Sequence, residues 1–351
     1  MNRVRFGVLS CAVLLSAACE EKKASAPTSA SAETPTGPAV DPNLAQAVAA
    51  ASVAAPTAAS PKNEDGPPES GVFAPGKADE MHKKGDAPKI DVGSTGGAPK
   101  RQLSLNLPPG SKQTGSIVLT MRAARQMLPP MQFDLSLEAQ KPKADDPATP
   151  LQVKVTTASL GDMQGQAMPP ELQAQIAKLK GSRVDLKVLA SGAVTDSRYE
   201  LPKGADPGLN TVLRTVAESL AVSSVVYPSE PVGVGATWLV TSREFATGAD
   251  VVSYRMFKLD ALTETDMTLS VSTKRYSATN KLTLAGLPPG DLSLEEFQYA
   301  ATGKATVAVG ALFPSESEQN QGLNAVLVPA DNPQQRMGVQ SQATATLKFP
   351  K

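Results

Sequence analysis

Polar and apolar residues alternate along a series of segments between residues 101 and 349. The segments are Arg101–Leu107, Gly115–Met121, Met131–Ala139, Leu151–Leu160, Arg183–Gly192, Met267–Ala278, Gly303–Ala311 and Gln342–Phe349. A period of two is typical of β-strands whose sheet has one face in a core and the other in water. The pattern therefore predicts a mainly antiparallel β-sheet.

Two segments show the period of a helix instead. Apolar residues recur every three or four positions at Leu209, Val212, Leu213, Val216, Ala217 and Leu220. Asp206 is the expected N-cap of this amphipathic helix, and Pro207 lies just inside its start. A shorter helix is predicted from Pro169 to Lys180, with Gly181 as its stop. Together with the strands, these helices give an α+β fold class.

The two halves of this region resemble one another. Gly115–Arg122 and Gly235–Arg243 each open a strand after a glycine, and the turn sequence LPPG occurs once in each half. Alternating strands resemble one another by default, so a duplication and a single continuous fold are both open. A duplication predicts two sheet units, 101–205 and 225–351, joined by the amphipathic helix.

The N-terminus has the layout of an export signal. Arg3 and Arg5 supply positive charge, the apolar run Phe6–Leu15 follows, and small residues stand directly before Cys19. The run is too short for a membrane-spanning helix. A small residue before a cysteine at this place resembles the lipobox of bacterial lipoproteins. The alternative is that Cys19 is an ordinary residue of a signal that is cleaved elsewhere.

The resemblance to lipoproteins has three implications. The signal peptide, residues 1–18, would be removed, the Cys19 thiol would be diacylated and the new amino terminus acylated. Several acyl chains together hold a protein firmly to a bilayer. Glu20, rather than Asp, follows the cysteine, which by the usual Asp-retention rule for lipoproteins implies the outer membrane.

Residues 19–100 differ in composition from everything that follows. Ala, Pro, Ser, Gly and Lys dominate there, and large apolar residues are scarce. Such a segment buries too little surface to offset the entropy of ordering it. We therefore predict a disordered tether over residues 19–100 and a β-rich folded region over residues 101–351.

One motif in the folded region is specific. Tyr227–Trp238 reads YPSEPVGVGATW, which resembles a Pro-x-x-Pro-Val-x-Val-Gly-x-x-Trp signature of uncharacterised bacterial lipoprotein families. The resemblance implies a periplasmic β-rich domain with no known activity. Trp238 is the only tryptophan, and we expect it to anchor the core, with ligand stacking as the alternative.

Composition and charge narrow the available chemistry. The chain has 34 Lys and Arg against 34 Asp and Glu, two cysteines and one histidine, His82. Both cysteines lie within the first 19 residues and His82 lies in the predicted tether, so we expect no catalytic triad, thiol chemistry, zinc site or cofactor in the folded region. The adjacent carboxylates Asp145/Asp146 and Glu295/Glu296 are the candidates for carboxylate chemistry.

These features predict a lipid-anchored cell-envelope protein with a non-catalytic binding or scaffolding role. The alternative is a periplasmic lipid or lipoprotein carrier with an apolar cavity, and a third, weaker hypothesis is a carboxylate-dependent hydrolase. The expected partners are the membrane, through lipid on Cys19, and another envelope protein or a lipid. Balanced, scattered charge argues against nucleic acid as a partner.

Overall fold

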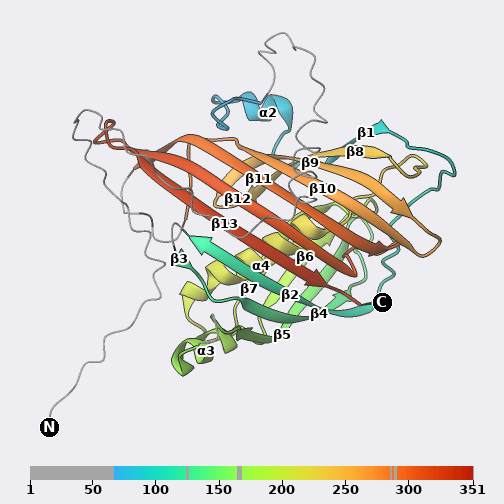
Figure 1. Ribbon diagram of the computed structural model, residues 1–351, viewed down its shortest axis with the longest axis horizontal. Helices are drawn as coiled ribbons and strands as arrows, with labels where there is room; N and C mark the ends of the chain where they lie inside the picture. Colours follow the sequence, from blue (N-terminus) through green and yellow to red (C-terminus); the bar gives the residue numbers. More distant parts are fainter. Residues whose placement is uncertain (1–66, 124–125, 164–167, 285–286, 288–290, 351) are drawn as a thin grey trace, which may run out of the picture. The chain divides into compact units, whose positions relative to one another are not determined.

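The computed structural model describes residues 67–123, 126–163, 168–284, 287 and 291–350. Within this part, one antiparallel sheet of 13 strands runs in the order β1-β8-β9-β10-β11-β12-β13-β2-β4-β5-β6-β7, and β3 pairs with β2 (Figure 1). The prediction of a mainly antiparallel sheet is confirmed.

The strands are β1 (Lys89–Ser94), β2 (Lys112–Ala123), β3 (Gln126–Met127), β4 (Met131–Ala139), β5 (Thr149–Leu160), β6 (Arg183–Val188), β7 (Val194–Glu200), β8 (Thr237–Ala246), β9 (Ala249–Leu262), β10 (Asp266–Ser277), β11 (Leu292–Ala308), β12 (Glu316–Pro329) and β13 (Met337–Lys348). The helices are α2 (Lys77–Met81), α3 (Pro170–Ala177) and α4 (Asn210–Ser223), and a 3-10 turn, Pro207–Leu209, precedes α4.

Alternating burial explains why the predicted strands form. In β4, Met131, Phe133, Leu135, Leu137 and Ala139 are buried and the residues between them are not. Their apolar side chains enter one core together with residues of β2, β5, β6 and α4. One face of the sheet is thus removed from water, which supplies the driving force for pairing.

Both predicted helices are present, and their ends are as informative as their bodies. The Asp206 side chain accepts a hydrogen bond from the Gly208 N–H at 2.8 Å, so it caps the 3-10 turn, while α4 itself begins at Asn210. After α3, Gly181 has a φ of 90°, a left-handed conformation that favours glycine. None of the described helices combines the length and apolar composition needed to cross a bilayer.

The sheet curls so that strands far apart in its order approach the same helix. β7 lies at one end of the strand order and β8 lies next to the other end. Residues of both strands nevertheless line one cavity beside α4. Figure 1 shows α4, in yellow, lying across the strands between the green strands of β4 to β7 and the orange and red strands of β9 to β13.

The two proposed sheet units are continuous with each other. β13, from the second unit, pairs with β2, from the first, with Lys348 opposite Ser116 and Thr344 opposite Thr120. Strands from 101–205 and from 225–351 therefore share one sheet, and the duplication is not confirmed. The structure is predominantly antiparallel sheet, and the α+β class with two sheet units is not confirmed.

The predicted strand at Arg101–Leu107 is wrong. Arg101 forms an isolated bridge with Val232, and the Asn106 N–H donates to the carbonyl of Gly310. An extended segment whose backbone partners come from different places forms no ladder. Its alternation has another cause, because Leu103 is buried in the core with Trp238 and Phe257.

The predicted tether is wrong for residues 67–100. This stretch contains α2, and it contains β1, which pairs with β8. Phe73 and Ala78 are buried against Val252 and Tyr276 on the outer face of the sheet. A few apolar contacts and a strand pairing suffice to order residues of this stretch, because the sheet already supplies the surface on which they pack. Residues 19–66, and Cys19 with them, lie outside the described residues.

Candidate functional site

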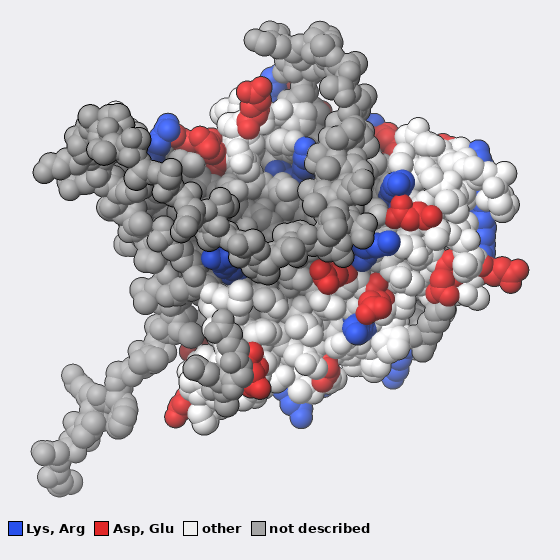
Figure 2. All heavy atoms as spheres, in the orientation of Figure 1, with Lys and Arg blue, Asp and Glu red and all other residues white. Residues whose placement is uncertain are grey.

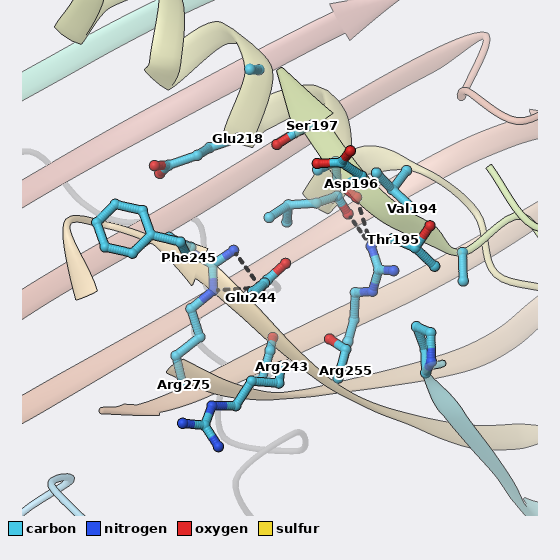
Figure 3. A pocket seen from close by; sticks show the side chains of 18 of the residues that line it. Val194, Thr195, Asp196, Ser197, Glu218, Arg243, Glu244, Phe245, Arg255 and Arg275 are labelled. Carbon is cyan, nitrogen blue, oxygen red and sulfur yellow. Dashed lines mark hydrogen bonds and ion pairs between the residues drawn. The ribbon is translucent and has the colours of Figure 1, made fainter. Parts of the chain in front are cut away.

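A cavity of about 390 Å³ lies between α4 and the inner face of β8, β9 and β10, with β7 at its side (Figure 3). Its charged lining residues are Lys84, Asp86, Asp196, Arg214, Glu218, Arg243, Glu244, Asp250, Arg255 and Arg275. Removing charges from water is costly unless each finds a partner. The pairing of these groups therefore determines what the cavity can bind.

Arg275 of β10 and Glu244 of β8 form an ion pair in the cavity (Figure 3). The Arg275 side chain is only 2% exposed, and its Nη2 and Nε atoms lie 3.1 and 3.2 Å from Glu244 Oε1. The guanidinium also lies 4.5 Å from the centre of the Tyr299 ring, a cation–π contact. Burial acts to lower the pKa of this guanidinium, but Tyr299, Glu244 and Glu218 outweigh it, so the pKa is raised. Arg275 is therefore charged and committed to its partners.

Glu218 reaches the cavity from α4. Its Oε2 atom accepts a hydrogen bond from the Thr247 N–H at 3.1 Å. Its Oε1 atom is buried without a hydrogen bond among the described residues, and the Arg214 Nε lies 3.7 Å from it. Burial raises the pKa of this carboxyl, and the positive charges of Arg275 and Arg214 offset the effect only in part. Glu218 is thus a buried carboxyl group whose negative charge is only partly compensated by its neighbours.

Arg255 of β9 closes the C-terminal end of α4. Its Nη1 atom donates to the carbonyls of Ala221, Val222 and Ser224 at 3.1, 2.8 and 3.2 Å. The last carbonyls of a helix have no partner within the helix and carry partial negative charge. The interaction joins the helix to the sheet. Burial lowers the pKa of Arg255 to about 10, with nearby Glu244 opposing the shift and Arg275 adding to it.

Arg243 of β8 binds the segment around α2, which precedes β1. Its guanidinium contacts Asp250 with two atoms, at 2.8 and 3.1 Å, and its Nη1 atom lies 2.7 Å from Asp79 Oδ1 and 3.2 Å from the carbonyl of His82. His82 was expected in the tether, and it is instead buried. Lys84 and Asp86, a few residues later, reach the edge of the cavity.

The carboxylate pairs that the sequence offered lie elsewhere. Asp146 accepts from Lys187 at 2.8 Å, which lowers the pKa of Asp146, and Glu295 pairs with Arg336 at 2.9 Å. Neither pair lines the cavity. On the face drawn in Figure 2, the coloured acidic and basic side chains are interspersed.

Trp238 is a core residue, as predicted. It is 1% exposed, stacks on Phe257 with ring centres 5.3 Å apart, and donates its indole N–H to the carbonyl of Val226 at 2.8 Å. Within its motif, Val232 is fully buried, and Gly235 adopts a φ of 88° in the turn that opens β8. The motif therefore fixes the entry of β8 into the sheet.

Sequence reasoning missed the cavity residues. A usable signal is present in β10, where the inward-facing row changes from Met267 and Leu269 to Thr273 and Arg275. The inward row of β9 likewise contains Arg255 between buried Ser253 and buried Phe257. A charged residue in a row that otherwise faces the core indicates a buried polar site.

No protein-family model matches the chain, and neither does any curated protein. Among solved structures, one of lipovitellin, described as showing lipid–protein interactions, matches with a TM-score of 0.43 and 10% sequence identity. The match covers 70% of this chain and 26% of the lipovitellin chain, so this chain spans about a quarter of that protein. Similarity at this level carries no conclusion about ligand or function.

Proposed function

We propose that this protein is a lipid-anchored protein of the cell envelope with a non-catalytic binding role. Acyl chains on Cys19 attach it to the outer membrane, as the lipobox-like sequence before Cys19 and the following Glu20 suggest. The folded region binds a ligand in the cavity beside α4 or acts as a scaffold. The main support for this proposal is that one side of α4 is buried in the core and the other borders the charged cavity.

The apolar side of α4 is buried in the core. Leu213, Val216 and Leu220 are at most 1% exposed and pack with β2, β4, β5 and β6. In the alternative, a lipid carrier, the helix would be a lid that leaves this interior to acyl chains. The interior beside the sheet is instead filled by the helix, which favours the binding or scaffolding role.

The cavity that α4 leaves open is charged. Glu218, Glu244 and Arg275 lie in it, and an acyl chain in contact with such groups would desolvate them without compensation. Glu244 is paired with Arg275 through its Oε1 atom, as expected of a structural ion pair. These contacts support a polar binding site over a lipid tunnel or a hydrolase.

The test measures covalent and non-covalent lipid in one experiment. Cells expressing the full chain are fed labelled palmitate, and the protein is isolated from the outer-membrane fraction and extracted with organic solvent. We expect label that resists extraction in the wild-type protein and none in Cys19→Ala. We also expect much less than one extractable lipid per chain.

Two results would contradict the proposal. Label retained by Cys19→Ala would show that the anchor is not at this residue. One tightly bound, extractable lipid per chain in both proteins would favour the carrier, because it would require an interior that α4 does not fill.

A further inference from the structure

We propose that the cavity beside α4 binds a small organic carboxylate with a short aromatic or apolar part, and that Arg255 binds the carboxylate. This assignment rests on the proposed binding role and names the ligand class for it. Three features of the cavity support this assignment: a guanidinium without a carboxylate partner, nearby carboxylates that repel a doubly charged ligand, and exposed aromatic rings in the lining.

Arg255 has spare donors, and its guanidinium lies 5.2 Å from the centre of the Phe257 ring. Among the described residues its hydrogen bonds all come from Nη1, and they go to backbone carbonyls of the α4 terminus. No described carboxylate lies within ion-pair distance of it, whereas Arg214 and Arg275 each have one and Arg243 has two. Helix carbonyls supply only partial charge. The Nε and Nη2 edge of Arg255 is thus available to an anion.

The surroundings of Arg255 favour a carboxylate with a single charge. The Nε and Nη2 edge of a guanidinium matches the two oxygens of a carboxylate. Glu244 does not take this place, and its Oε1 atom is held by two nitrogens of Arg275. Glu244 and Glu218 remain close to the cluster, so a ligand with two negative charges would be repelled more than one with a single charge.

The walls of the cavity supply the apolar contact. Phe245 and Tyr199 both line it, and they are 59% and 39% exposed, which is high for aromatic side chains. Ala217, Ala221 and Val222 of α4 form an apolar part of the wall. Figure 3 shows Phe245 near Glu218, on the opposite side of the view from Thr195. A volume of about 390 Å³ is within the range of small-molecule sites.

The experiment compares ligands that share one ring and differ in charge. Calorimetric titration of the full chain in non-ionic detergent uses phenylacetate, 2-phenylethanol, 2-phenylethylamine and phenyl phosphate. We expect phenylacetate to bind at least about tenfold more tightly than the neutral and cationic ligands, a difference of about 1.4 kcal/mol. We also expect it to bind more tightly than phenyl phosphate.

Two variants locate the site. Arg255→Gln should weaken phenylacetate binding at least about tenfold. Lys258→Gln is the matched control, because Lys258 lies on the same strand, is exposed and loses the same charge; its affinity should equal that of the wild type. If Arg255→Gln does not fold, Phe245→Ser replaces it, and phenylacetate binding should weaken severalfold, since this exposed ring can be removed without disturbing the core.

Several outcomes would overturn the assignment. They are equal binding of phenylacetate and 2-phenylethanol, tighter binding of phenyl phosphate, unchanged affinity in folded Arg255→Gln or in Phe245→Ser, and absence of phenylacetate binding. None of these results depends on how much lipid the protein contains. The ligand class can therefore fail while the proposed binding role stands, and a carrier-like lipid content would overturn the role whatever phenylacetate does.

Discussion

The two sides of α4 meet two different halves of the same sheet. One side carries Val216 and Leu220 into an apolar core with β2, β4, β5 and β6. The other side carries Arg214 and Glu218 to a cavity where β8, β9 and β10 contribute Glu244 and three further arginines. The apolar half is closed by packing, and the charged half is held by specific pairs around a cavity.

The difference shows how one helix can be fixed in a core and also border a polar cavity. Apolar packing is nondirectional, and its strength grows with the area removed from water, so it sets the position of α4 firmly. Ion pairs and helix-end hydrogen bonds depend on each individual partner. Stability should therefore respond most to changes on the apolar side, and binding and pH dependence should respond most to changes on the charged side.

The largest expected effect is on the apolar side. Val216→Asp would bury a carboxylate without a partner at a position that is 0% exposed, which costs several kcal/mol. We expect loss of cooperative unfolding in circular dichroism. Asn210→Asp adds the same charge at an exposed position of α4 and should unfold as the wild type does. A Val216→Asp protein that unfolds cooperatively but loses a lipid found with the wild type would show that α4 is a lid.

A smaller effect is expected on the charged side. Arg275→Met removes the partner of Glu244, and because the Glu244 side chain keeps 32% exposure, water compensates in part. We expect a loss of about 2 kcal/mol in denaturant unfolding, below the cost of breaking a fully buried pair. Adding Glu244→Gln should restore part of the loss, since the uncompensated charge is then gone. A double variant less stable than Arg275→Met would show that the pair is not coupled in this way.

The smallest effect should depend on pH. Burial raises the pKa of Glu218 above its ordinary value of 4.5, so its contribution to stability is fully present below that value and is lost as pH rises through the raised pKa. Glu218→Gln avoids the buried charge and can still accept from the Thr247 N–H. We expect it to be more stable than the wild type at pH 8 and equal to it at pH 4.

The control for this titration is Glu171→Gln, at an exposed position of α3. Its stability relative to the wild type should not change between the two pH values. A Glu218→Gln gain that is the same at pH 4 and pH 8 would show that the ionisation of Glu218 is not its source.

The sequence alone determined the elements whose burial is periodic. β4 and α4 were predictable because alternation or a helical stripe records which side of each faces a core. The same rule failed at Leu103, whose segment is buried without forming a strand. All of β12 was also missed, because Asn320, Gly322 and Asn324 weaken its alternation although the strand pairs along its length with β11 and β13.

Only the tertiary structure decided where isolated apolar residues and buried charged residues lie. Phe73 and Ala78 lie in a stretch too poor in apolar residues to fold alone, and the surface that orders them is built by β9 and β10, far along the chain. Glu218, Glu244, Arg255 and Arg275 look like solvated residues in sequence. They form one cavity because the sheet curls around α4, and the pairing of strands distant in the chain, rather than any local pattern, sets that curl.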